Sequence, residues 1–216
     1  MQLVFVHGLS ASSRWWRDVL PLLGGRRARL LDLPRFGQSF RPEHVVDWLA
    51  GELEPDAPVV LVGHSLGGLV CASLAAARPD LVEALVLVAP VGAPSARSLR
   101  AYATGLARTF IGARLGLLRT IAGDAMRTGP EALLLGARFA TETSFAGRIG
   151  APTLLIWGAR DSLIPVELAA EWQLAIPGSR LEVIDGAAHV PMVETPLAFA
   201  ERLLQFLDDL GDHRGV

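Results

Sequence analysis

The stretch Val59-Val60-Leu61-Val62-Gly63-His64-Ser65-Leu66-Gly67-Gly68 sets a serine between two different kinds of backbone pattern. The apolar run before it is typical of a buried strand, and the alanine-rich segment after it, 69–77, is typical of a helix. Glycines on either side of Ser65 leave room in a tight turn where side chains would collide. A Gly-x-Ser-x-Gly turn in this position predicts that the Ser65 hydroxyl stands above the edge of a sheet as a nucleophile.

Strand and helix patterns alternate on both sides of this turn. Apolar runs that suit strands covered on both faces lie at about 2–6, 28–31, 58–62, 84–89, 153–157 and 181–184. Helical patterns lie at about 13–23, 42–53, 66–78, 165–176 and 196–210. The alternation predicts an α/β fold with a mostly parallel sheet of about six strands and helices on both faces.

The alternation stops between residues 92 and 147. That segment has no strand pattern, and an apolar stripe interleaved with arginines predicts two or three helices there. One interpretation is an ordinary packed helical segment. We favour a helical cap, because an insertion between two strands lies on the carboxyl side of the sheet, where open parallel sheets bind ligands. The expected organisation is then a core of residues 1–91 and 148–216 with a cap insertion at 92–147.

Composition excludes several classes of protein. The net charge of −2 leaves no electrostatic footprint for nucleic acid, and no apolar run approaches the roughly 18 residues that span a membrane. The start of the chain has no signal-peptide pattern, so we expect a cytoplasmic protein. The single cysteine and the lack of a Cys/His cluster predict neither a disulfide nor a metal site, and no cofactor is implied. The oligomeric state is left open.

A serine nucleophile needs a base and an acid that orients the base. His189 follows the strand pattern at 181–184, which places its imidazole at the carboxyl end of a strand, whereas His213 lies in a polar tail. Asp161 follows the strand pattern at 153–157 and is the predicted acid. Asp185 is the competing acid, but it lies too close in sequence to His189 to face it easily. Two further acidic candidates, Asp124 and Glu142, fall in the expected cap.

The oxyanion that forms during acyl transfer needs two hydrogen-bond donors. One is expected to be the backbone N–H of Leu66, directly after the nucleophile. The other is expected from Leu9, in the loop His7-Gly8-Leu9 that follows the first strand. We expect His7 and His64 to be structural, packing or hydrogen-bonding beside the two turns.

Five motifs together make the chain resemble the α/β-hydrolase superfamily, and within it the small capped carboxylesterases. These motifs are His7-Gly8-Leu9, the segment Asp-Leu-Pro-Arg-Phe-Gly-Gln-Ser at 32–39, Gly-His-Ser-Leu-Gly-Gly at 63–68, Gly158-Ala159-Arg160-Asp161 and Gly186-Ala187-Ala188-His189. The resemblance implies a sheet that lacks the N-terminal hairpin, the first two of the usual eight strands. Arg35 departs from the family pattern, which has glycine there. Either the loop tolerates a side chain, or Arg35 lies near the mouth of the site and holds an anionic substrate.

The motifs favour a serine hydrolase that cleaves a small or medium carboxylic ester, with Ser65, His189 and Asp161 as the catalytic triad. Its partner would be a small-molecule ester. Alternatives that keep the triad are a lyase, a thioesterase and a cofactor-free perhydrolase. A non-catalytic ligand receptor on the same fold is a fourth hypothesis, which an intact triad disfavours.

Overall fold

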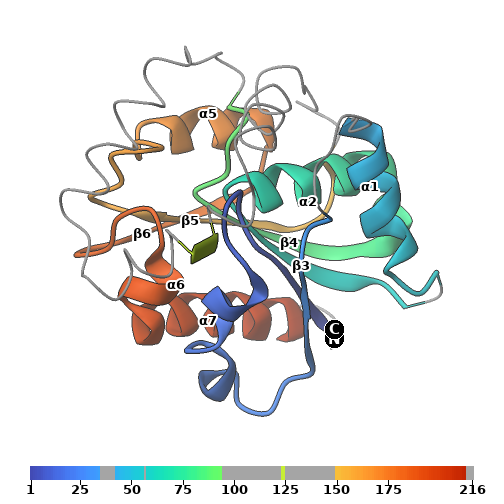
Figure 1. The fold of residues 1–216 in the computed structure, drawn as a ribbon, viewed down its shortest axis with the longest axis horizontal. Helices are drawn as coiled ribbons and strands as arrows, with labels where there is room; N and C mark the ends of the chain where they lie inside the picture. The colour runs from blue at the N-terminus through green and yellow to red at the C-terminus, as the bar shows by residue number, and fades with distance from the viewer. Residues whose placement is uncertain (35–41, 56, 94–122, 125–148, 213–216) are drawn as a thin grey trace.

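A parallel sheet of six strands forms the centre of the molecule in the computed structural model (Figure 1). The structure describes residues 1–34, 42–55, 57–93, 123–124 and 149–212. The strand order is β2-β1-β3-β4-β5-β6, with every neighbouring pair parallel. The strands are β1 (Leu3–Val6), β2 (Ala28–Leu31), β3 (Val59–His64), β4 (Val82–Val88), β5 (Thr153–Gly158) and β6 (Arg180–Ile184). The six-stranded α/β architecture predicted from the sequence is confirmed.

The order of the strands reverses between β1 and β3. From β1 the chain moves outward to β2, and then crosses back to place β3 on the other side of β1. Loops that leave two such strands diverge to opposite sides of the sheet, so a crevice opens at their carboxyl ends. The loop after β1 and the turn after β3, which carry the predicted nucleophile and oxyanion donors, meet at this switch point.

Helices cover both faces of the sheet (Figure 1). An apolar core lies on each face, between the sheet and its helices. One face carries α1 (Pro42–Gly51), α2 (Leu66–Ala77) and α5 (Leu168–Ala175), while the other carries the 3-10 helix η1 (Ser13–Trp16), α6 (Pro191–Glu194) and α7 (Pro196–Asp212). Alternate residues of one strand enter opposite cores, as Val4 and Phe5 do in β1. Every residue of β1 and β3 is buried, as expected of strands covered on both sides.

The predicted helix at 13–23 was wrong. Two short 3-10 helices stand in its place, η1 and η2 (Leu20–Leu22). Pro21 has no N–H to donate and its ring conflicts with the carbonyl four residues earlier, so an α-helix cannot run through this position. Gly24 and Gly25 then turn the chain with positive φ angles of 61° and 77° towards β2. The predicted helix at 165–176 begins later than expected, at Leu168, with turns over the residues before it.

Most of the predicted cap at 92–147 lies outside the described residues, which include only 92–93 and 123–124 of it. The cap therefore stays a prediction, as does the division into core and cap. Within the described ranges, no helix combines the length and the apolar character needed to cross a membrane.

The long C-terminal helix α7 offers a matched test of how burial stabilises this fold. Leu203 is fully buried on the sheet, whereas Leu197 on the same helix is 61% exposed. We expect Leu203→Ala to lower the free energy of unfolding by about 2–5 kcal/mol, because it removes buried apolar contacts and leaves a cavity. Leu197→Ala is the control and should change it by less than about 0.5 kcal/mol. Denaturant unfolding measures both, and equal losses would contradict the assignment of this face to the core.

Candidate active site

Ser65 occupies a strained turn between β3 and α2. Its backbone has φ 52° and ψ −115°, a left-handed conformation that a non-glycine residue adopts only under constraint from its surroundings. A side chain at Gly63 would lie 2.6 Å from the carbonyl oxygen of Gly67, and one at Gly67 would overlap the carbonyl oxygen of His7. The two glycines that suggested this turn in the sequence are therefore required by backbone packing. Ser65 itself is 8% exposed, at the switch point of the sheet.

His189 and Asp161 lie in hydrogen-bonding contact. The Nδ1–H of His189 donates to the Oδ2 of Asp161 at 2.8 Å, and both side chains are buried. The other carboxylate oxygen of Asp161 accepts the backbone N–H groups of Leu163, at 2.9 Å, and Ile164, at 2.8 Å. These bonds fix the carboxylate, which in turn fixes the tautomer of His189 and leaves its Nε2 as the basic nitrogen.

Adjacent parallel strands bring these two residues together. Asp161 follows β5, His189 follows β6, and the carboxyl ends of the two strands lie side by side. The approach is so close that a side chain at Gly158 would overlap the carbonyl oxygens of Ala188 and Ala187. Asp185, the competing acid in the sequence, is exposed at the end of β6, whereas the carboxylate that contacts His189 is that of Asp161.

The loop after β1 passes directly beside Ser65. A Cβ placed on Gly8 would lie 3.1 Å from the Cβ of Ser65 and 2.9 Å from the Nδ1 of His64. Leu9 follows Gly8, and Leu66 is the first residue of α2, so the backbone groups predicted as oxyanion donors flank Ser65 on two sides. The Leu66 side chain belongs to the core on the α2 face of the sheet, and the partly buried Leu9 side chain packs against this core.

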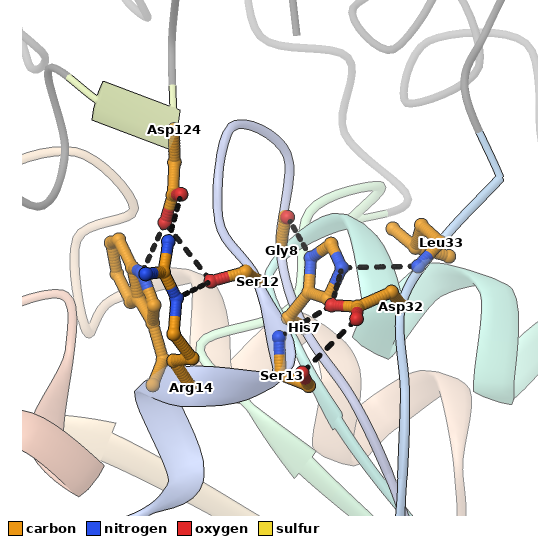
Figure 2. A network of polar contacts seen from close by, with 9 residues as sticks. His7, Gly8, Ser12, Ser13, Arg14, Asp32, Leu33 and Asp124 are labelled. Carbon is orange, nitrogen blue, oxygen red and sulfur yellow. Dashed lines mark hydrogen bonds and ion pairs between the residues drawn. The ribbon is translucent and has the colours of Figure 1, made fainter. Parts of the chain in front are cut away.

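Hydrogen bonds that involve the ring of His7 and the carboxylate of Asp32 hold this loop in place (Figure 2). The Nδ1–H of His7 donates to the Gly8 carbonyl at 2.7 Å, and its Nε2 accepts the Leu33 N–H at 3.0 Å. Asp32 accepts the N–H of Ser13 at 2.7 Å and its hydroxyl at 3.1 Å. Burial lowers the pKa of His7, in keeping with a neutral ring that donates once and accepts once. These contacts agree with the structural role expected for His7.

His64 lies behind His189. Its Nε2–H donates to the backbone carbonyl of His189 at 2.9 Å, and its ring is 2% exposed. Burial first, and then the neighbouring His189, hold the pKa of His64 well below its usual value. The ring is therefore neutral near pH 7.

The sequence did not predict the contacts of one buried acidic residue, Asp124. Asp124, which the sequence offered only as a rejected acid, accepts hydrogen bonds from the side chains of Trp15 at 2.9 Å, Ser12 at 3.2 Å and Arg14 at 3.2 Å (Figure 2). Its partners lie about 110 positions away in sequence, so no local pattern signals the contact. The only sequence signal is an isolated acidic residue in an apolar, arginine-rich segment.

Two residues that the sequence analysis discussed have no described position in the structure. Arg35, the residue proposed to hold an anionic substrate, lies outside the described residues, as does His213.

In the part of the chain that the structure describes, no three side chains of His, Cys, Asp or Glu gather closely enough to hold a metal ion. Cys71 is buried beside Gly63, and burial raises the pKa of its thiol, so it is an inert part of the core.

The close contact between Gly158 and the loop before His189 can be tested by adding one methyl group. We expect Gly158→Ala to displace His189 and to slow the labelling of Ser65 by a fluorophosphonate about 100-fold, because a small misplacement of a base costs that much. Gly150→Ala is the matched control, since a Cβ at Gly150 meets only open space. Unchanged labelling in Gly158→Ala would show that the loop gives way without moving the base.

The low pKa of His64 predicts a pH dependence of stability. Below about pH 6.5 His64 takes up a proton in the unfolded chain while the folded ring stays neutral, so folding becomes less favourable as the pH falls. Replacing it by His64→Gln removes this contribution. We expect the difference in unfolding free energy, wild type minus His64→Gln, to fall by about 1.4 kcal/mol per pH unit below pH 6.5. Denaturant unfolding between about pH 5 and pH 8 measures this difference, and a constant value would contradict the assignment.

Comparisons with known proteins find relatives of similar sequence and similar fold. The chain is 30% identical to a pimeloyl-[acyl-carrier protein] methyl ester esterase of Neisseria meningitidis serogroup A, over 96% of this chain and 77% of the relative. It is 29% identical to the enzyme of the same name from Aeromonas hydrophila, over 95% of this chain and 94% of the relative. A solved thermophilic esterase is 26% identical, with a TM-score of 0.79 over 97% of this chain and 90% of the esterase.

A model of the alpha/beta hydrolase family matches residues 3–202, which include the turn at Ser65 and the loops of Asp161 and His189. The relatives named as esterases and the esterase of known structure indicate the type of reaction. The chain therefore belongs to the alpha/beta hydrolase family, as an enzyme that hydrolyses ester bonds.

Proposed function

We propose that this enzyme cleaves a carboxylic ester through a Ser65–His189–Asp161 triad and an acyl-enzyme. The observation that carries the proposal is the 2.8 Å hydrogen bond from His189 to the buried Asp161, in a chain whose Ser65 occupies a strained strand-to-helix turn. This bond leaves the Nε2 of His189 free to accept a proton. A base oriented in this way is what a serine hydroxyl needs to become a nucleophile.

In the first half of the reaction, the Oγ of Ser65 attacks the ester carbonyl while the Nε2 of His189 takes the hydroxyl proton. His189 then gives that proton to the departing alcohol, and the acyl group stays on Ser65. In the second half, water attacks the acyl-enzyme, with His189 taking a proton from it and returning one to Ser65. Asp161 stays ionised and stabilises the imidazolium in both halves.

The negative charge that forms on the carbonyl oxygen would be stabilised by the backbone N–H groups of Leu9 and Leu66. Leu66 supports this role because it begins α2, where the first N–H groups of a helix lack partners within the helix. Leu9 supports it because its loop lies against Ser65, with no room for a side chain at Gly8. Fixed donors of this kind cost no reorganisation during the reaction.

For the substrate, we propose a methyl ester of an acyl chain attached to an acyl carrier protein. The relatives that carry this substrate in their names match 94–96% of the chain. Arg35 stays a proposed contact for an anionic group of such a substrate. A cytoplasmic location stays a prediction as well.

The proposal is tested by assaying Ser65→Ala on p-nitrophenyl esters of increasing chain length and on a pimeloyl methyl ester. We expect at least about a 1,000-fold loss of turnover, because removal of the nucleophile abolishes the acyl-enzyme route. Ser73→Ala, on the same helix α2, is the control and should retain turnover. Product analysis should find the free acid and the alcohol. No Ser65-dependent turnover on any ester, or an elimination product, would contradict the proposal.

A further inference from the structure

A chain of side-chain contacts leads from the segment between β4 and β5 to the back of His189. It consists of Asp124, Trp15 and His64, which we name the His189 support. None of the three belongs to the proposed triad, and they come from three separate parts of the chain.

The first contact of the support holds the backbone of His189. The Nε2–H of His64 donates to the carbonyl oxygen of His189 at 2.9 Å, and the two ring centroids lie 4.8 Å apart. His64 is the last residue of β3, directly before Ser65, so the sheet fixes its backbone. His189 is thereby held at two points, by Asp161 on its ring and by His64 on its main chain.

The second contact holds His64. The ring of Trp15 stacks on that of His64, with centroids 6.2 Å apart and planes inclined by 30°. Trp15 is buried, and its Nε1–H donates to Asp124 at 2.9 Å. This bond fixes the rotation of the indole, and with it the surface against which His64 packs.

The third contact ties Asp124 to the loop after β1. Its carboxylate is 2% exposed and also accepts from Ser12 and Arg14, both at 3.2 Å (Figure 2). A buried carboxylate is costly unless several donors compensate it, so the arrangement of these donors is specific. Asp124 is therefore held in one position relative to Trp15.

We propose that His64 is a positioning residue for His189, and that Asp124, through Trp15, is part of the same support. The inference rests on the proposed role of His189 as general base. A general base must keep its nitrogen within hydrogen-bonding reach of the proton it removes, and small displacements are costly in rate. The support acts on His189 and away from the substrate, so its loss is expected to lower kcat and leave KM unchanged. It also links the position of Gly123–Asp124 to the catalytic base.

The first experiment separates a hydrogen-bonding role of His64 from simple packing. His64→Phe keeps a ring and loses the donor, while His64→Gln places an amide N–H near the position of Nε2. With a p-nitrophenyl ester as substrate, we expect His64→Phe to lower kcat about 10- to 100-fold, with KM within twofold of wild type. His64→Gln should recover most of that loss. His44→Phe, an exposed histidine on α1, is the matched control.

Three outcomes would overturn the role of His64. They are a kcat of His64→Phe within twofold of wild type, a loss confined to KM, and a His64→Gln variant as slow as His64→Phe. Thermal unfolding checks that each variant is folded. Ser65→Ala and His189→Ala are run in parallel, because turnover that persists in them would contradict the proposed function instead.

The second experiment tests the remainder of the support, and stands even if His64→Phe does not fold. Trp15→Phe loses the indole N–H, and Asp124→Asn loses the charge and one acceptor oxygen. We expect each single variant to lower kcat about three- to tenfold. The double variant should be no slower than the slower single variant, because both substitutions disrupt the same contact, the one between Trp15 and Asp124. Asp185→Asn, an exposed acid after β6, is the control. If the two substitutions lower kcat additively, or change KM alone, Asp124 does not belong to the His189 support.

Discussion

The tight turn at Ser65 is the constraint on which the rest of the site depends. A non-glycine residue at φ 52° costs about 1–3 kcal/mol and persists only where its surroundings impose it. Here the Ser65 N–H donates to Val88 in β4 at 2.9 Å, and its carbonyl accepts from Val91 at 3.3 Å. The turn is thus fastened to the neighbouring strand. Gly67 lies against the backbone of His7, so the same turn also sets how closely the loop after β1 can approach.

Three buried histidines around this turn have different environments and therefore different chemistry. His7 and His64 each donate one hydrogen bond to a backbone carbonyl, and burial lowers the pKa of both rings. His189 instead donates its Nδ1–H to the carboxylate of Asp161. The type of partner, a carbonyl or a carboxylate, separates the structural histidines from the proposed catalytic one.

The sequence predicted the four inner strands well because β1, β3, β4 and β5 are buried on both faces. Such strands are continuous apolar runs, and the ends of β3 and β5 fall at the turns that carry Ser65 and Asp161. The segment at 13–23 misled the prediction because its apolar spacing suits a helix, while Pro21 forbids one. A periodic pattern reports which side chains are buried and not which backbone hydrogen bonds can form.

By itself, the sequence determined the order of the strands along the chain, and it predicted Ser65, His189 and Asp161 as nucleophile, base and acid. It could do so because glycines at close approaches and residues at strand ends leave local patterns. Only the tertiary structure decided which carboxylate contacts His189, how His7 fastens the loop after β1, and that Asp124 is tied to Trp15 and His64 to His189. The last two contacts join residues 109 and 125 positions apart. No local pattern encodes such pairs, because packing of the whole chain brings them together.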